Sequence, residues 1–332
     1  MDYFYHLQIL LIQGFQAIGS WLTIPMKFFT SLGFEEFYLV IMPAIYWCID
    51  SALGLRIGTM LVLSNGVNSF FKVALHSPRP YWYDPGVRPL ASETSFGIPS
   101  GHAQNAASVW GLVAASTKKR WATGLVIFFV LMIGLSRIYL AVHFVSDVLA
   151  GWLIGAILLV LYLRLEPAVS TKLQTTSFKG LVLFSIGSTL VILAIMGLPI
   201  LALGSWQAPA QWQANALAAL PDVPFEPLSP TGAFTLSGLW LGLTLGAAWI
   251  YRRTDGFRVQ GSFIQRALRY ALGMAGTVLL WLGLKQIFPE ADTVLGYSLR
   301  LVRYAIVGTW VTALAPLLFL KLKLAESNSK PV

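Results

Sequence analysis

The chain has 332 residues, of which 56% are hydrophobic and only 11% are charged, whereas soluble domains carry about 25% charged residues. This composition excludes a soluble globular domain. The net charge of +9 does not require nucleic acid as a partner, because the Lys and Arg residues cluster between apolar runs, as orientation signals of membrane proteins do. The single cysteine, Cys48, excludes an intrachain disulfide and a thiolate metal cluster.

Apolar runs long enough to cross a bilayer recur along the whole chain, since about 20 apolar residues suffice for one crossing. They predict an all-α polytopic membrane protein with spans near residues 7–28, 35–51, 54–75, 102–117, 121–141, 145–164, 180–203, 231–251, 267–288 and 298–320. The first run is open to a second interpretation, because Gln8, Gln13 and Gln16 give it a polar stripe that also suits a helix lying on the membrane surface.

Two long connections interrupt this series. The first, residues 76–100, is too rich in proline for a continuous helix. The second, residues 205–230, holds Trp206 and Trp212 but no Lys or Arg, which indicates an interfacial or external loop. We expect residues 1–168 to form a six-span core and residues 169–332 a second membrane region of about four spans, whose function the sequence does not indicate.

The distribution of basic residues predicts the orientation. When the ten spans alternate sides, fifteen of the 23 Lys and Arg residues fall on one side and eight on the other, and the richer side should be cytoplasmic. This predicts a multi-pass protein of the plasma or inner membrane with both termini in the cytoplasm. The charge-poor loops would then face the periplasm or the cell exterior.

Three segments that hold unusual polar residues fall at helix ends on this charge-poor side. They are Lys72 to Pro80, Pro99-Ser100-Gly101-His102, and Ser136-Arg137 followed by His143 and Asp147. Lys72, Arg79 and Arg137 provide three cations at one membrane face, a suitable clamp for the oxygens of a phosphoryl group. Ser100 can cap a helix start, and Gly101 lets a phosphate approach the backbone closely.

The two histidines and the aspartate of these segments have the composition of a nucleophilic site. His143 and Asp147 are four residues apart and share a face if their segment is helical. A carboxylate that holds one imidazole nitrogen leaves the other free to attack phosphorus, so His143 is the predicted nucleophile. His102 fits the acid that protonates the leaving oxygen and then the base that activates water.

These segments resemble the three signature motifs of the type 2 phosphatidic acid phosphatase superfamily, which also contains vanadium haloperoxidases. The first motif is Lys, six residues, Arg-Pro, here from Lys72 to Pro80; the second is the Pro-Ser-Gly-His of residues 99–102. The third is met by Ser136, Arg137, His143 and Asp147. The resemblance covers residues 1–165 and implies a six-helix core, a phosphohistidine at His143, acid/base work by His102, a phosphate clamp, and no metal or cofactor.

Other notable residues have ordinary explanations. We interpret Tyr81, Trp82 and Tyr83 as aromatic belt residues. Glu93, in the first long connection, either pairs with Arg88 or is solvated, and solvation is the favoured interpretation. Glycines recur every four residues at 151 and 155 and at 238, 242 and 246, which predicts close helix packing and offers a route to a homo-oligomer.

The leading hypothesis is a phosphatase whose substrate is a lipid phosphomonoester or pyrophosphate, such as undecaprenyl pyrophosphate, phosphatidate or phosphatidylglycerophosphate. A lipid phosphotransferase would share the first half-reaction. A lipid transporter is a hypothesis from another class, suggested by ten spans. Against it, segments 180–203 and 231–251 lack ionisable residues until their ends, and no repeat relates the halves.

Overall fold

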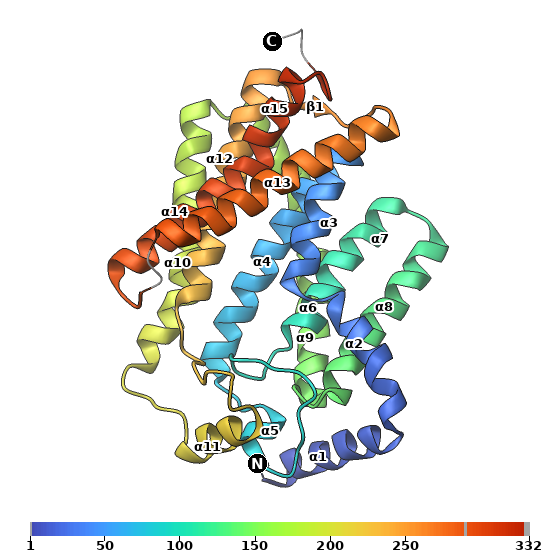
Figure 1. Ribbon diagram of the computed structural model, residues 1–332, viewed down its shortest axis with the longest axis vertical. Helices are drawn as coiled ribbons and strands as arrows, with labels where there is room; N and C mark the ends of the chain where they lie inside the picture. The colour runs from blue at the N-terminus through green and yellow to red at the C-terminus, as the bar shows by residue number, and fades with distance from the viewer. Residues whose placement is uncertain (1, 289–290, 329–332) are drawn as a thin grey trace. The chain divides into compact units, whose positions relative to one another are not determined.

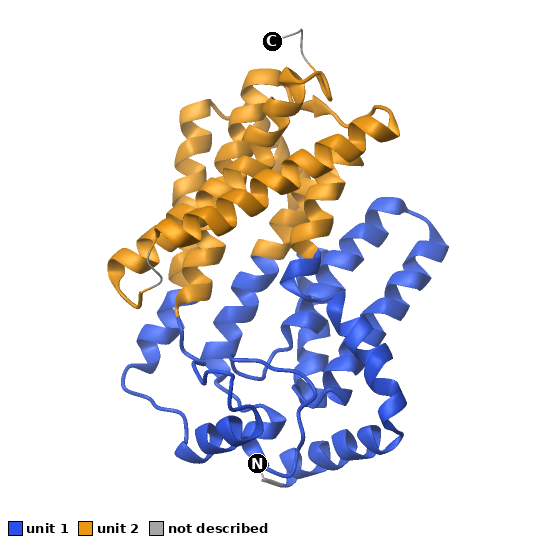
Figure 2. Ribbon diagram, viewed as in Figure 1, with its two compact units in different colours: residues 1–37, 63–163, 196–229 blue, residues 38–62, 164–195, 230–332 orange. Residues whose placement is uncertain are grey.

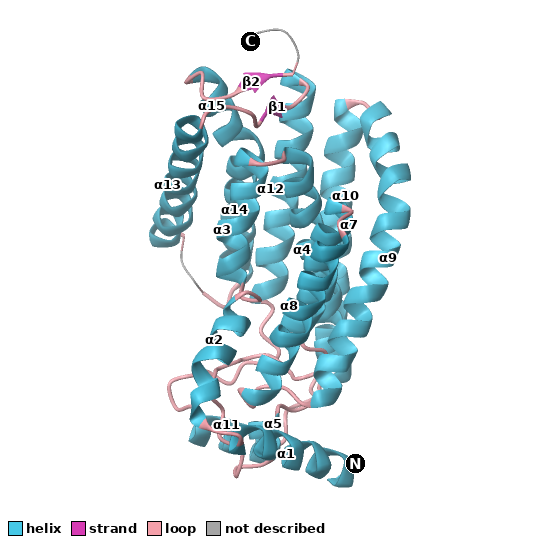
Figure 3. Ribbon diagram, turned by 90° about the vertical axis from the view of Figure 1, so that its right-hand side faces the viewer, coloured by secondary structure: helices cyan, strands magenta, loops and turns pink. Residues whose placement is uncertain are grey.

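The computed structural model describes residues 2–288 and 291–328, and most of this chain is helical (Figures 1 and 3). The helices are α1 (Asp2–Ala17), the 3₁₀ turn η1 (Ser20–Leu22), α2 (Thr23–Ser31), α3 (Glu35–Cys48), α4 (Ser51–Leu75), α5 (Pro80–Tyr83), α6 (Gly101–Asn105), the π-helical η2 (Ala106–Trp110), α7 (Gly111–Thr117), α8 (Arg120–Tyr139), α9 (Val145–Thr175), α10 (Phe178–Leu203), α11 (Ala210–Ala219), α12 (Thr231–Thr254), α13 (Phe263–Ile287), α14 (Val294–Thr309), the π-helical η3 (Trp310–Leu314) and α15 (Ala315–Lys321). The short strands β1 (Phe257–Arg258) and β2 (Glu326–Ser327) pair antiparallel. The predicted all-α fold class is confirmed.

Six stretches of helix in the described part of the chain are long and apolar enough to cross a membrane. They are α8, α9, α10, α12, α13 and the continuous run Val294–Lys321. Each coincides with a predicted span. The predicted spans at 35–51 and 102–117 are the short helix α3 and the run from α6 to α7, while the span at 54–75 is α4, which carries polar Ser64 and Asn68 in its apolar sequence.

The first predicted span, residues 7–28, is not one straight crossing. α1 and α2 are separated by a break and bent by 90° relative to each other. Gln8, near the start of this pair, bonds the backbone of Ser146, and Thr30, at its end, bonds Arg137. The first predicted span is therefore two helices joined at a bend, and its crossing of the membrane stays a prediction. Gln8, a member of the polar stripe, makes one of these contacts.

The described chain forms two compact units, each assembled from separate stretches (Figure 2). Unit 1 contains residues 1–37, 63–163 and 196–229, and unit 2 contains residues 38–62, 164–195 and 230–332. The three polar segments all belong to unit 1. The predicted division of the chain at residue 168 stays a prediction.

An aromatic and aliphatic core in unit 1 surrounds the polar segments. Its members come from α1, α2, α5, α6, α8, α9 and α11 and from the loops around residues 87–96 and 140–144. Phe96, Leu140 and Phe144 are fully buried in it. The core therefore fixes the two loops that carry the predicted site residues.

Glycines let the helices of each unit approach closely. In unit 1, a Cβ on Gly151 of α9 would lie 2.5 Å from the Ser100 carbonyl oxygen, and one on Gly155 would collide with the Gln104 carbonyl. In unit 2, the glycines at 238 and 242 of α12 bring that helix against the backbone of α14. The predicted close packing is confirmed, and these glycine faces contact helices of the same chain.

Candidate active site

The structure brings the three predicted motifs together in unit 1 through backbone hydrogen bonds. The N–H of Ser100 donates to the carbonyl oxygen of Asp147 at 2.9 Å, which joins the second motif to the third. Arg79 of the first motif donates from Nη1 to the carbonyl oxygen of Val142 at 2.8 Å, beside His143. The convergence at one set of helix ends, predicted from the alternation of spans, is therefore what the fold produces.

The cations lie close together and are withdrawn from solvent. Lys72, in the last turn of α4, donates from Nζ to the Ser95 hydroxyl and to the Phe96 carbonyl oxygen, both at 2.8 Å. Arg79 donates to the same Phe96 carbonyl oxygen from Nη2 at 3.1 Å. Arg79 and Arg137 have no exposed surface. Buried guanidinium groups are costly unless they are paired, so this cluster needs an anion.

Glu93 supplies that anion. Its carboxylate accepts from Arg79 Nη2 at 3.4 Å and forms a short ion pair with Arg137 Nη2. Burial raises the pKa of Glu93, but the charges of Arg79 and Arg137 lower it by a larger amount. The pKa therefore lies well below its usual value, and the group is ionised at neutral pH. The interpretation of Glu93 as a solvated residue is wrong. Charge balance was the sequence signal for its true role, because buried cations in a membrane protein require a counter-charge.

The aromatic residues after Arg79 are also part of the site. Tyr81 and Trp82 are each 1% exposed, so the belt interpretation is wrong for both. The Tyr81 hydroxyl donates to the Glu93 carbonyl oxygen at 2.9 Å, and the Arg79 guanidinium carbon lies 5.9 Å from the centre of a Trp82 ring. These contacts hold Glu93 and Arg79 in place.

His143 lies in the turn between α8 and α9, between a carboxylate and a guanidinium. Its Nδ1 lies 3.2 Å from Asp147 Oδ2, and its Nε2 lies 3.3 Å from Arg79 Nη1. Because Arg79 can only donate, the hydrogen-bond partners assign the ring proton to Nδ1 and a lone pair to Nε2. Burial and the nearby charges of Arg79 and Lys72 lower the pKa of His143 well below its usual value. The imidazole is therefore neutral near pH 7, as a nucleophile must be.

Asp147 is oriented by its own set of contacts at the start of α9. Its Oδ2 also accepts from the backbone N–H of Phe144 at 2.9 Å. A Cβ on Gly97 would lie 3.1 Å from this Oδ2 and 2.5 Å from the Pro78 carbonyl oxygen, so only glycine fits between the first and third motifs. The predicted pairing of His143 with Asp147 is present, but the two residues do not share a helix, because His143 lies in the turn before α9.

His102 and its neighbours begin α6. The Ser100 side chain caps this helix by accepting from the Ala103 N–H at 3.5 Å, as predicted. The His102 ring packs edge-on against Phe34, with ring centres 5.1 Å apart. Within residues 2–288 and 291–328, His102 Nε2 is buried and has no hydrogen-bond partner. Arg137, Glu93, Lys72 and Arg79 all interact with His102 electrostatically. The ring thus adjoins the clamp with one nitrogen uncommitted.

A buried polar network on α4 supports the second motif, and the sequence analysis did not identify it. Asn68 Nδ2 donates to the Pro99 carbonyl oxygen at 3.2 Å and to Gln104 Oε1 at 2.9 Å. Gln104 Nε2 in turn donates to the Ser64 carbonyl oxygen at 2.7 Å. Ser64, Asn68 and Lys72 recur every four residues and so lie on one face of α4. That periodicity was the available signal.

The first helices hold the third motif from the other side. Arg137 Nη1 donates to the Thr30 hydroxyl at 2.6 Å, and Gln8 Oε1 accepts from the Ser146 N–H at 2.9 Å. Gln16 Nε2 donates to the Tyr139 carbonyl oxygen at 2.9 Å. Two of the three glutamines that made the first span ambiguous therefore bond the backbone within four residues of His143.

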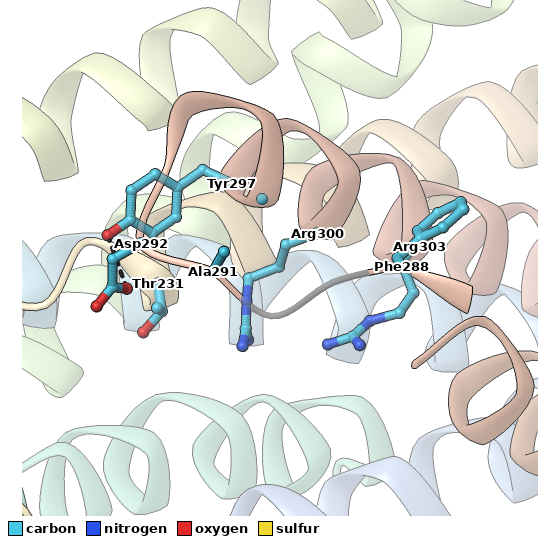
Figure 4. Close-up of a pocket in the computed structure, with 8 residues that line it drawn as sticks. Thr231, Phe288, Ala291, Asp292, Tyr297, Arg300 and Arg303 are labelled. Carbon is cyan, nitrogen blue, oxygen red and sulfur yellow. Dashed lines mark hydrogen bonds between the residues drawn. The ribbon is translucent and has the colours of Figure 1, made fainter. Parts of the chain in front are cut away.

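A pocket in unit 2 lies outside this site. It has a volume of about 90 Å³, is lined by Thr231, Phe288, Ala291, Asp292, Gly296, Tyr297, Arg300 and Arg303 (Figure 4), and contains none of the motif residues. Among the described residues, no group of three or more His, Cys, Asp or Glu side chains is placed to hold a metal ion.

Comparison with known proteins places these residues in a family. Residues 53–170 match the model of the PAP2 superfamily, and residues 234–327 match that of the PAP2 superfamily phosphatase transmembrane extension. Sphingosine-1-phosphate phosphatase 2 of Homo sapiens is 36% identical over 143 residues, which are 41% of this chain and 35% of that protein. The chain thus spans about a third of this relative's length.

A second relative matches along nearly the whole chain. Glucose-6-phosphatase 3 of Rattus norvegicus is 28% identical over 336 residues, 92% of this chain and 90% of that protein. The crystal structure of a transmembrane PAP2 type phosphatidylglycerolphosphate phosphatase from Bacillus subtilis is 27% identical, with a TM-score of 0.44, and covers 51% of this chain and 89% of that one. Because the first family model spans all three motifs and the second spans the C-terminal helices, the chain belongs to the PAP2 superfamily, as its motifs predicted.

Proposed function

We propose that the protein is a membrane-embedded phosphatase that hydrolyses a lipid phosphomonoester or pyrophosphate through a phosphohistidine at His143. The observation that carries the proposal is the geometry of His143, whose Nδ1 faces Asp147 and whose Nε2 lies beside the clamp cation Arg79. The named function of sphingosine-1-phosphate phosphatase 2, a relative with 36% identity, supports a lipid substrate.

The reaction runs in two displacements. The Nε2 lone pair of His143 attacks phosphorus, and the bond from phosphorus to the ester oxygen breaks as His102 gives that oxygen a proton. A water then attacks the phosphohistidine, the P–N bond breaks, and the water's proton returns to His102. The products are the lipid alcohol, or the monophosphate from a pyrophosphate, and inorganic phosphate.

The remaining predicted residues stabilise the charge that moves during transfer. Lys72, Arg79 and Arg137 hold the phosphoryl oxygens, and the start of α6 at Ser100 and Gly101 offers backbone N–H donors to them. Arg79 Nη1 has to leave His143 Nε2 for the substrate before attack, because the same lone pair forms the new bond. No step in this scheme requires a metal or cofactor.

A second candidate substrate class is a water-soluble phosphomonoester. The observation that favours it is the match of glucose-6-phosphatase 3 to 92% of this chain, including the helices after the motif region. The chemistry at His143 would be unchanged. Only the group that leaves with the ester oxygen would differ.

One assay separates these candidates. The purified protein is given sphingosine-1-phosphate, phosphatidate, phosphatidylglycerophosphate and undecaprenyl pyrophosphate in mixed micelles, and glucose-6-phosphate in solution, all with EDTA. We expect phosphate release from at least one lipid, and none from the His143→Ala variant. Preferential release from glucose-6-phosphate would select the second candidate, and equal release by His143→Ala would defeat the mechanism. Candidate alcohol acceptors, added to the same assay, report a phosphotransferase by a new phosphorylated product.

In this proposal the active site faces the periplasmic or extracellular side of the membrane, because the loops on the side that carries the motifs are poorer in Lys and Arg. The bonds from Tyr5 to Ser77 and from Gln8 to Ser146 support a position of α1 on that same side, instead of the cytoplasmic N-terminus predicted. In a Cys48→Ser background, a cysteine introduced in loop 84–95 should react with an impermeant reagent on intact cells. Reaction only after lysis would reverse the orientation.

A further inference from the structure

The connection between α10 and α12 packs onto the loops that form the phosphate clamp. This segment, residues 204–229, includes α11 and lies in unit 1 together with the motifs. It lies outside both matched family regions and carries none of the three motifs. The Asn215 side chain is 5% exposed and donates to the Trp82 carbonyl oxygen at 2.9 Å.

Two aromatic residues of segment 204–229 contact Phe96 and Trp82, which hold the clamp cations. The ring of Trp206 lies 5.8 Å from that of Phe96 and 4.8 Å from that of His76. The ring of Phe225 lies 4.8 Å from that of Trp82. All three contacts are edge-on, the geometry that aromatic pairs prefer.

Phe96 and Trp82 are the residues through which these contacts act. The Phe96 carbonyl oxygen accepts from both Lys72 and Arg79, while the Phe96 ring is fully buried. The Trp82 ring lies beside the Arg79 guanidinium and 6.2 Å from the Phe96 ring. A shift of either ring would therefore move an acceptor or a face that positions a clamp cation.

We propose that residues 204–229 are a positioning element of the phosphate clamp, in which Trp206 fixes Phe96, and Asn215 and Phe225 fix Trp82. The inference rests on the proposed function, since it concerns the same site. None of these three residues touches the reacting atoms. They act on Lys72 and Arg79, so their loss should weaken phosphate binding more than it slows the chemical step.

The test compares Trp206→Ala, Trp206→Phe and Asn215→Ala with Leu217→Ala. Leu217 is on α11 and 40% exposed, so its replacement should leave all constants unchanged. For Trp206→Ala we expect KM, and the inhibition constant of inorganic phosphate, to rise about three- to tenfold, with kcat changed less than about twofold. Trp206→Phe keeps an aromatic ring and should restore most of the loss. Asn215→Ala removes the bond to the Trp82 carbonyl oxygen and the bond that Asn215 Oδ1 accepts from Gln211, with little change in packing, and should raise the same two constants.

The outcomes separate this inference from the proposed function. If the wild type releases phosphate while Trp206→Ala and Asn215→Ala keep its KM and its inhibition constant, the positioning role is refuted and the phosphatase stands. If the wild type hydrolyses no substrate, the proposed function fails. The rise in unfolding temperature produced by inorganic phosphate then decides the inference: a smaller rise in Trp206→Ala than in Leu217→Ala supports it, and equal rises overturn it.

Discussion

Asn68 donates a hydrogen bond from Nδ2 to the Pro99 carbonyl oxygen at 3.2 Å and thereby ties α4 to the start of the second motif. The same Nδ2 also donates to Oε1 of Gln104, which lies one turn into the helix that Ser100 caps. Lys72 lies in the last turn of the same helix α4. One side chain therefore sets the distance between a clamp cation and the segment that carries His102.

The Asn68→Asp variant should separate these two parts of the site. An aspartate of the same size has no hydrogen to donate and would face two acceptor oxygens. We expect the free energy of unfolding to fall by about 1–3 kcal/mol and kcat/KM to fall about tenfold. Asn65→Ala is the matched control, because Asn65 bonds Asn105 and not the motif. It should lose stability and keep kcat/KM; a kcat/KM of wild-type size in Asn68→Asp would contradict this role.

Glu93 should be required by both buried arginines. Glu93→Gln keeps the shape of the side chain and removes its charge, so Arg79 and Arg137 lose their shared counter-ion. We expect unfolding to become easier by about 1–3 kcal/mol, less than for a fully buried pair because the Glu93 side chain is 21% exposed. We also expect kcat/KM to fall. Asp84→Asn removes a charge from the same loop and should do neither, as measured by thermal unfolding and phosphate release.

The pH dependence of that stability difference follows from the lowered pKa of Glu93. A carboxylate whose folded-state pKa is depressed stabilises the protein above its ordinary pKa, and this contribution is lost as the pH falls through the folded-state value. The gap in unfolding temperature between the wild type and Glu93→Gln should therefore stay constant from neutral pH to about pH 5. It should close only in stronger acid. A gap that closes between about pH 7 and pH 5 would show that Glu93 is not held by the arginines.

Asp147 should matter through its bond to His143 Nδ1. Asp147→Asn keeps one oxygen that can accept from both the Phe144 N–H and His143 Nδ1, as Oδ2 does, but it removes the carboxylate charge that stabilises the positive charge on the imidazole when Nε2 bonds phosphorus. We expect kcat to fall by about 10²- to 10⁴-fold with stability nearly unchanged. Quenched reactions with ³²P-labelled substrate should show a phosphoenzyme in the wild type, less of it in Asp147→Asn, and none in His143→Ala. Labelling that survives in His143→Ala would remove the phosphohistidine from the mechanism.

The sequence predicted the site residues that lie at helix ends, because alternating spans bring such ends to one membrane side whatever the loops do. It did not predict Glu93, Trp82 or Trp206, because their partners depend on the path of two loops that have no helical or strand periodicity. The first apolar run was long enough to span a membrane, and its glutamines alone could not decide between a crossing and a surface helix. That choice depends on bonds to Ser146 and Tyr139, more than 100 residues away in the chain.

Gly151 should control how closely α9 approaches the second motif. A Cβ at this position would lie 2.5 Å from the Ser100 carbonyl oxygen, so Gly151→Ala must push α9 away from α6. The bond from the Ser100 N–H to the Asp147 carbonyl oxygen, one turn earlier on α9, would stretch. We expect Gly151→Ala to cost about 1–3 kcal/mol of stability and to reduce phosphate release.

Gly124 offers the matched control, because it lies within helix α8 and a Cβ there would have nothing within 4 Å. Gly124→Ala should raise the free energy of unfolding by about 0.5–1 kcal/mol, since alanine is the better helix former where space allows it. Opposite signs for the two substitutions, measured by unfolding in the same detergent, are the expected result. A Gly151→Ala protein as stable as Gly124→Ala would mean that α9 does not need a glycine to hold Asp147 against Ser100.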